Sequence, residues 1–139
     1  MTPKEKAKDK RLRKTYGWTL EMYNKLLELQ GGVCYGCGNP PKKASLNVDH
    51  RHFKVQIGGS RGAWYAAVPE LTPAFFYAET KAECIRQAKE FCMPFSVRGL
   101  LCAGRHGTGC NTKLGRIDNA KWLRKMADYL DDPPARKIL

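Results

Sequence analysis

Two stretches of the chain carry apolar residues at helical spacing. From Leu20 to Gln30 they recur every three or four positions, Thr19 is suited to cap the first turn, and Gly31-Gly32 ends the run. A second run lies near the C-terminus and ends at Asp131-Asp132-Pro133-Pro134. Its apolar residues share one face: Trp122, Leu123, Met126, Ala127 and Leu130. The pattern predicts one helix after Thr19 and another in the last part of the chain.

Two short segments alternate between apolar and polar residues. They are Leu46–His50 and Val97–Leu101, and both are bounded by polar or glycine-rich sequence. Period-two alternation is typical of half-buried strands. We therefore expect two short core strands that are far apart in the sequence.

The residues between these strands predict a separate ββα unit. Phe53–Ile57 alternates, Gly58–Gly62 predicts a turn, and Ala63–Val68 predicts a second strand. Thr80-Lys81-Ala82-Glu83 is a capping box that opens a helix, and Met93-Pro94 is expected to close it. The apolar face of this helix holds Cys84, Ile85, Ala88, Phe91 and Cys92. Together the elements predict an α+β fold with flanking helices and a ββα insertion between the two core strands.

The chain divides into three segments on this pattern. Residues 1–15 form a basic N-terminal tail, residues 16–52 and 96–139 form the core, and residues 53–95 form the inserted subdomain. The tail, with seven Lys/Arg between Met1 and Lys14 and no apolar stretch, is not a secretory signal. We expect it to be disordered and solubilising, and whether it also contacts phosphate is left open.

Charge narrows the class of partner. The 139 residues carry a net charge of +12, and no apolar run is long enough to cross a membrane. Such a basic chain is typical of proteins that bind nucleic acid rather than membrane. Residues 53–96 contribute only +1, which leaves +11 on the rest of the chain. A DNA-binding face is therefore expected on the core and tail, outside the insert.

Four of the six cysteines predict a structural zinc site. Cys34 and Cys37 have the usual spacing of two intervening residues, whereas Cys102 and Cys110 are separated by seven, of which three are glycines. Without a signal peptide, such pairs are more typical of metal ligands than of disulfides. An all-cysteine site is favoured over one in which His106 replaces a cysteine. A secreted disulfide framework and a redox CxxC are weaker alternatives.

The two remaining cysteines, Cys84 and Cys92, are interpreted as small core residues of the inserted helix.

The zinc site would also gather a catalytic set. His50 is suited to take a proton from water, and the oxygens of Asp49 and Asn111 are suited to hold Mg²⁺. Because Asn111 follows Cys110, a shared zinc ion would carry it back beside the Asp49-His50 pair. Taken singly, the Asp-His pair can arise by chance, Asn111 can cap a helix, and His52 can be an ordinary exposed histidine.

These stretches resemble the recombination endonuclease VII family of His-Me finger (ββα-metal) nucleases, known chiefly from phages. The matching sequences are Gly31-Gly32-Val33-Cys34-Tyr35-Gly36-Cys37, Val48-Asp49-His50-Arg51-His52, Val97-Arg98-Gly99-Leu100-Leu101-Cys102 and Cys110-Asn111-Thr112-Lys113-Leu114-Gly115. The family departs from this chain in two places. It joins the two core strands by a short turn where this chain has its insert, and its second zinc pair is closer together.

The resemblance implies a zinc-bound ββα-metal core with zinc on Cys34, Cys37, Cys102 and Cys110. It implies His50 as general base, Asp49 and Asn111 as ligands of catalytic Mg²⁺ or Mn²⁺, and His52 as a histidine that assists near the scissile phosphate. It also implies cleavage of branched DNA, including four-way junctions, with a location in the host cytoplasm for a phage protein. Phage DNA-processing or packaging proteins are expected partners.

The insert is similar to the ββα unit of HicB-like antitoxins over Trp64–Leu71 and Thr80–Ala88. Such a unit is a scaffold, which either fills out a small core or offers a docking surface.

The sequence therefore predicts a Mg²⁺-dependent DNA endonuclease that resolves or debranches junctions, or nicks DNA less selectively. A four-way junction has approximate two-fold symmetry, which favours a homodimer. The rival function is a non-catalytic zinc-dependent DNA-binding or adaptor module. Such a module would not need Asp49, His50 and Asn111.

Overall fold

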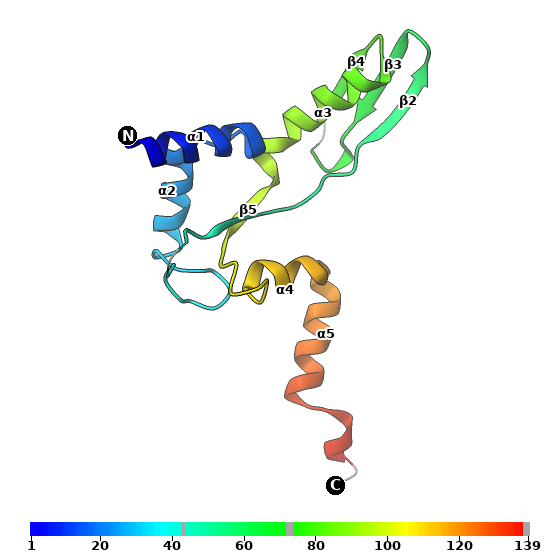
Figure 1. The fold of residues 1–139 in the computed structure, drawn as a ribbon. Coiled ribbons are helices and arrows are strands. Elements are labelled where there is room, and N and C mark those ends of the chain that lie inside the picture. Colours follow the sequence, from blue (N-terminus) through cyan, green and yellow to red (C-terminus); the bar gives the residue numbers. More distant parts are fainter. Residues whose placement is uncertain (43, 72–73, 138–139) are drawn as a thin grey trace.

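Two antiparallel sheets organise the part of the chain that the computed structural model describes, which is residues 1–42, 44–71 and 74–137 (Figure 1). β1 (Asn47–His50) pairs with β5 (Val97–Leu101). β2 (Gln56–Ser60), β3 (Ala63–Ala67) and β4 (Phe75–Ala78) form the other sheet, in that order. The predicted strands at β1 and β5 are confirmed, and so is the mixed α+β class.

The N-terminal segment is helical, so the prediction of a disordered tail was wrong. α1 (Pro3–Tyr16) begins with a capping box, in which the Glu5 backbone N–H donates to the Thr2 hydroxyl at 3.2 Å and the Thr2 N–H donates to the Glu5 carboxylate at 2.6 Å. It ends at Gly17, which has a φ of 66°. The many charged residues of this segment suggested a tail, so neither the capping box nor the terminal glycine was recognised from the sequence.

α1 packs against the core through Leu12, which is 2% exposed. α2 (Leu20–Leu29) follows after a short turn and is capped by the Thr19 hydroxyl, as predicted. The side chain of Gln30 then bonds both backbone groups of Leu100, accepting from its N–H at 2.8 Å and donating to its carbonyl at 3.0 Å. These bonds fix the end of α2 to the middle of β5. The first core contains Leu12, Leu20, Tyr23, Cys34, Leu46, Leu100 and Leu101.

The three-stranded sheet packs on α3 (Lys81–Ser96). It differs from the predicted ββα unit in three respects. β2 runs through the two glycines to Ser60, so that the turn is confined to Arg61-Gly62; β4 is an additional strand; and α3 continues through Pro94 directly into β5. Pro94 is accommodated in the last turn of α3, where its ring lies against Gly17 and its carbonyl accepts a 2.9 Å hydrogen bond from the Trp18 indole.

A second core fills the space between this sheet and α3. It contains Ala66, Val68, Ala74, Cys84, Ala88 and Cys92. Cys84 and Cys92 are buried there, which confirms that they are core residues. A short 3-10 helix, Pro69–Leu71, lies between β3 and β4.

The C-terminal part consists of α4 (Cys110–Arg116), α5 (Ala120–Asp131) and a 3-10 helix, Pro134–Lys137. α5 confirms the predicted final helix, and Asn119 caps it. In Figure 1 this helix extends away from the rest of the chain. Its apolar face is uncovered, since Trp122 is 44% exposed and Leu130 is 74% exposed. In the described ranges, every helix is too short or too polar to traverse a bilayer.

If α1 is part of the core, removing its buried side chain should destabilise the whole fold. We expect Leu12→Ala to lower the free energy of unfolding of the zinc-loaded protein in urea by about 2–5 kcal/mol. Lys10→Ala, at an exposed position two residues away, should change it by less than about 0.5 kcal/mol. Equal unfolding curves for the two variants would show that α1 does not contribute to the core.

Candidate metal centre and adjoining cleft

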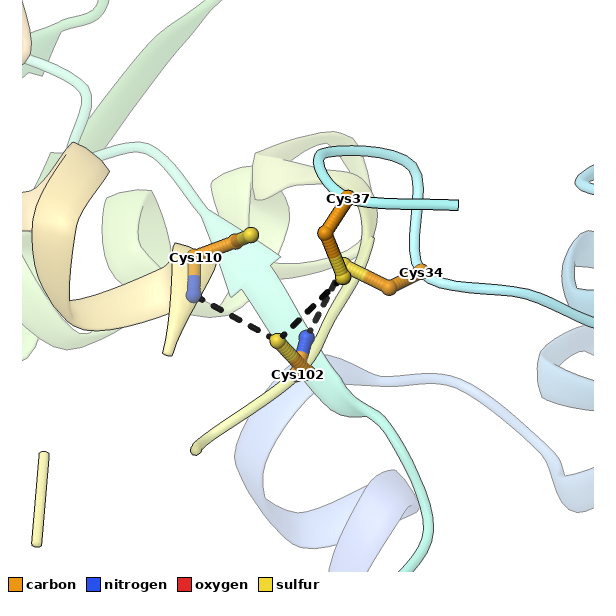
Figure 2. Close-up of side chains that lie close together, drawn as sticks. All are labelled: Cys34, Cys37, Cys102 and Cys110. Atoms are coloured by element: carbon orange, nitrogen blue, oxygen red, sulfur yellow. Dashed lines mark hydrogen bonds between the residues drawn. The ribbon is translucent and has the colours of Figure 1, made fainter. Parts of the chain in front are cut away.

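Four cysteines from two distant segments meet at one point (Figure 2). Cys34 and Cys37 lie in the turn after α2, Cys102 follows β5, and Cys110 is the first residue of α4. Their sulfur atoms all lie within 4.8 Å of one another, and the Cys37 and Cys102 sulfurs are 3.9 Å apart. In a tetrahedral zinc–thiolate site with Zn–S bonds of about 2.3 Å, the sulfurs are separated by about 3.8 Å. The cluster therefore fits a structural zinc ion.

The long spacing between Cys102 and Cys110 is absorbed by a closed loop. The Gly109 N–H donates to the Ala103 carbonyl at 2.9 Å, and the Asn111 N–H donates to the Cys102 carbonyl at 3.2 Å. These bonds bring the ends of the loop together, so both cysteines reach the same point. His106 lies in the exposed part of the loop and outside the cysteine cluster. The geometry thus agrees with the all-cysteine set.

The surroundings of the cluster favour thiolate at Cys34. Burial opposes ionisation of this thiol, but backbone N–H groups of Cys37, Cys102 and Gly36 outweigh it and lower the pKa of Cys34 to about 6. Burial, with hydrogen bonds among the thiols, raises the pKa of Cys110 to about 12. Gly36 allows the close approach, because a side chain there would begin 2.8 Å from the Cys110 sulfur. Without a cation, ionisation is thus favoured at Cys34 and opposed at Cys110; a bound zinc ion would stabilise thiolate at both.

In β1, the carboxylate of Asp49 is held by Arg98. The guanidinium donates from Nε to Oδ2 at 2.8 Å and from Nη2 to Oδ1 at 3.0 Å, and its third nitrogen reaches Asp118 at 2.8 Å. Asp49 pairs with Gly99 and His50 with Val97, so Arg98 is the extra residue of a β-bulge. The bulge turns Arg98 toward the buried carboxylate. Hydrogen bonds from Arg98 to Asp49 and Asp118 raise the pKa of the guanidinium above its ordinary value.

Sequence reasoning did not identify Arg98 or Asp118 as parts of the site. Arg98 stands in the motif that precedes Cys102, but its contact depends on the bulge between two distant strands. A carboxylate oxygen offers two lone pairs, and each Asp49 oxygen accepts one hydrogen bond from Arg98. Asp49 therefore keeps acceptor capacity for a hard cation.

His50 and Asn111 line one cleft of about 320 Å³, together with residues of α1 and the start of β1. Asp49 is not among the residues that line this cleft. The ring of His50 lies 5.4 Å from that of Tyr16 and 4.9 Å from that of His52, measured between centroids. His50 and His52 also line a second hollow of about 290 Å³ beside α3. The structure thus places the His50 imidazole and Asn111 in the lining of one cleft, and Asp49 is the residue before His50 in β1.

Comparison with known proteins gives one result for this chain. The model of a family described as recombination endonuclease VII matches residues 9–132. Searches of curated proteins and of solved structures found no match. The matched range contains the four clustered cysteines and the Asp49-His50 strand.

If the cluster is a zinc site, the protein should bind one zinc ion per chain, and Cys37→Ser should abolish that binding and unfold the core. Cys92→Ala, which alters a cysteine of the second core, should keep its zinc. Affinity should fall as the pH is lowered, because protons compete for the thiolates. Metal analysis with circular dichroism provides the measurement. A folded Cys37→Ser protein with full zinc content would contradict the assignment.

Proposed function

The chain belongs to the recombination endonuclease VII family, and from this premise we propose that it is a metal-dependent endonuclease that cuts branched DNA. The observation that carries the proposal is the meeting of His50 and Asn111 in one cleft beside the cysteine cluster. Four-way junctions are the first candidate substrate, and less selective nicking of duplex DNA is the second.

His50 is the proposed general base. Histidine is the side chain best suited to proton transfer near neutral pH. The rings of Tyr16 and His52 both lie against the ring of His50, with interplanar angles of 55° and 77°, and such contacts restrict its orientation. A water molecule between His50 and a bound phosphate would lose its proton to the imidazole as it attacks phosphorus.

Asp49 and Asn111 are the proposed ligands of Mg²⁺ or Mn²⁺, which would stabilise negative charge on the phosphate and on the leaving oxygen. Both ligands offer oxygen atoms, the donors that these cations prefer. Arg98 holds the Asp49 carboxylate from one side and leaves acceptor capacity on both oxygens. The backbone of Asn111 is fixed, because it follows Cys110 and its N–H donates to the Cys102 carbonyl.

His52 is proposed to assist at the phosphate. It shares the second hollow with His50 and Lys89, and the guanidinium of Arg51, which also lines it, pairs with Glu70. Lys89 therefore supplies positive charge on this side of His50. A phosphate group placed there would meet cationic donors and the imidazole of His52 together.

The direct test uses zinc-loaded protein with a supercoiled plasmid and a synthetic four-way junction in the presence of Mg²⁺. The unaltered protein should cut, and His50→Ala should be slower by about 10²–10⁴-fold, the usual contribution of a general base. His106→Ala, in an exposed loop outside the cleft and the cluster, should cut at the normal rate.

Two results would contradict the proposal. Tight binding of junctions without cleavage by the unaltered protein would indicate a DNA-binding adaptor. Normal cleavage by His50→Ala would leave a nuclease whose base lies elsewhere.

We also infer that the protein acts as a homodimer through α5. Resolution of a two-fold symmetric junction requires two cuts, and the uncovered apolar face of α5 is the kind of surface that a second copy covers. Trp122, Leu123 and Leu130 are 38–74% exposed on this face.

Leu123→Asp with Leu130→Asp should convert a dimer to a monomer in light scattering and should reduce paired cuts in junctions to single nicks. Lys121→Ala with Lys125→Ala makes the same change in net charge on the polar face and should leave the dimer intact. A monomeric unaltered protein that still makes paired cuts would refute this inference.

A further inference from the structure

One face of α1 forms a wall of the cleft that contains His50 and Asn111. Lys8, Arg11 and Thr15 line this cleft, and they recur at the three- and four-residue spacing of one helix face. Tyr16, at the end of the same helix, also lines the cleft and contacts the His50 ring. The segment expected to be a tail therefore borders the candidate catalytic group.

The positive charges of α1 are divided between two faces. Lys4 lies one turn before Lys8 on the same side of the helix, beyond the residues that line the cleft. Lys6, Lys10 and Lys14 are exposed on other sides of the helix and do not line the cleft. Burial, with the charges of Arg11 and Lys4, lowers the pKa of Lys8. Three cations therefore lie close enough to repel one another. An anion in the cleft would relieve that repulsion.

These three cations have no carboxylate partner among the residues that the structure describes. Arg13 makes a useful contrast, because it does not line the cleft and pairs with Asp9 at 2.6 Å. Asp9 in turn caps α2 by accepting from the Leu20 N–H at 2.7 Å. Glu5, the other acidic side chain of α1, accepts from the Thr2 N–H in the capping box. Both acidic side chains of the helix are thus used to build the fold, and the cleft side keeps its positive charge.

Lys8 is also held in a defined position. Its ammonium lies 3.5 Å from the centroid of the Tyr23 ring, a cation–π contact with a buried residue. The Tyr23 hydroxyl donates to the Leu46 carbonyl at 2.8 Å, immediately before β1. The ammonium is therefore fixed relative to the strand that carries His50. A pre-placed cation binds an anion with less loss of side-chain entropy.

The length of the basic face of α1 can be compared with the rise of a DNA duplex. From Lys8 to Tyr16 the helix axis advances about 12 Å at about 1.5 Å per residue. Measured along a duplex axis, that length corresponds to three or four base pairs at about 3.4 Å each. With Tyr16 against His50, Arg11 and Lys8 lie progressively farther from the proposed point of cleavage.

We propose that Lys8 and Arg11, with Lys4 and Thr15 on the same face of α1, bind successive phosphates of the DNA strand that is cut, on one side of the scissile phosphate. This proposal rests on the proposed function, since it takes His50 as the reacting end of the cleft. The proposal adds to that function the surface that binds the DNA backbone, and the direction in which the strand runs along α1 from the point of cleavage. A phosphate contact of this kind positions DNA without reading its sequence.

The test compares two double variants of equal charge, Lys8→Gln with Arg11→Gln and Lys6→Gln with Lys10→Gln. Both are made in zinc-loaded protein that also carries His50→Ala, so that the DNA stays intact. The affinity for a labelled four-way junction is measured over a range of salt concentrations. Loss of Lys8 and Arg11 should make the slope of log affinity against log salt shallower by about one for each lost contact. Loss of Lys6 and Lys10 should leave the slope nearly unchanged.

A second readout locates the contacts on the DNA. Replacing single phosphates by neutral methylphosphonates should weaken binding most within about four nucleotides on one side of the cut. The Lys8→Gln, Arg11→Gln protein should show no further loss at those positions, because the partners are already absent. Equal effects of the two double variants, or neutral linkages that act equally everywhere, would overturn the proposal.

Folding is checked by zinc content and circular dichroism. If the Lys8 variant fails to fold, Lys4→Gln with Arg11→Gln retains the contact of Lys8 with Tyr23 and serves the same test. The two proposals can fail separately. An unaltered protein that cuts no DNA refutes the nuclease, whereas normal cutting with unchanged salt slopes refutes the role of α1.

Discussion

The convergence of four cysteine sulfurs is the constraint on which the rest of this structure depends. It joins the turn after α2 to the end of β5 and the start of α4, which are far apart in the sequence. Both cores of the described chain are small, and a zinc ion held by the four cysteines would stabilise the first of them. Because Asn111 follows Cys110, that ion would also hold Asn111 in the cleft that His50 lines.

Charge is used differently in the cleft and at the residue next to its lining. Asp49, which precedes His50 in β1 but does not line the cleft, is buried and bonded by Arg98, which also reaches Asp118. Lys8 and Arg11, which do line the cleft, have no acidic partner in the described part of the chain. The Asp49 carboxylate is thus suited to bind a cation, and the α1 wall of the cleft is suited to meet phosphate. Division of this kind is what a phosphodiester-cleaving site requires.

Features encoded by local pattern could be predicted from the sequence, whereas features set by distant contacts could not. Thr19 and the apolar spacing after it defined α2, and alternation defined β1 and β5. α1 was missed because its lysines suggested a tail, although Thr2 and Glu5 form a capping box. Pro94 was expected to end α3, but packing on Gly17 and Trp18 places it within the last turn. The four cysteines were predicted by type, whereas the contact of Arg98 with Asp49 depends on a bulge between distant strands.

The central claim is that the thiolate site positions a second, oxygen-liganded cation beside His50. Anomalous diffraction from crystals grown with zinc and then soaked in Mn²⁺ tests it most directly, because the two metals are distinguished at their absorption edges. The account predicts a zinc peak among the four cysteine sulfurs and a manganese peak bonded to an Asp49 carboxylate oxygen and to Asn111 Oδ1. Manganese bound elsewhere, with the Asn111 amide turned away from Asp49, would contradict it.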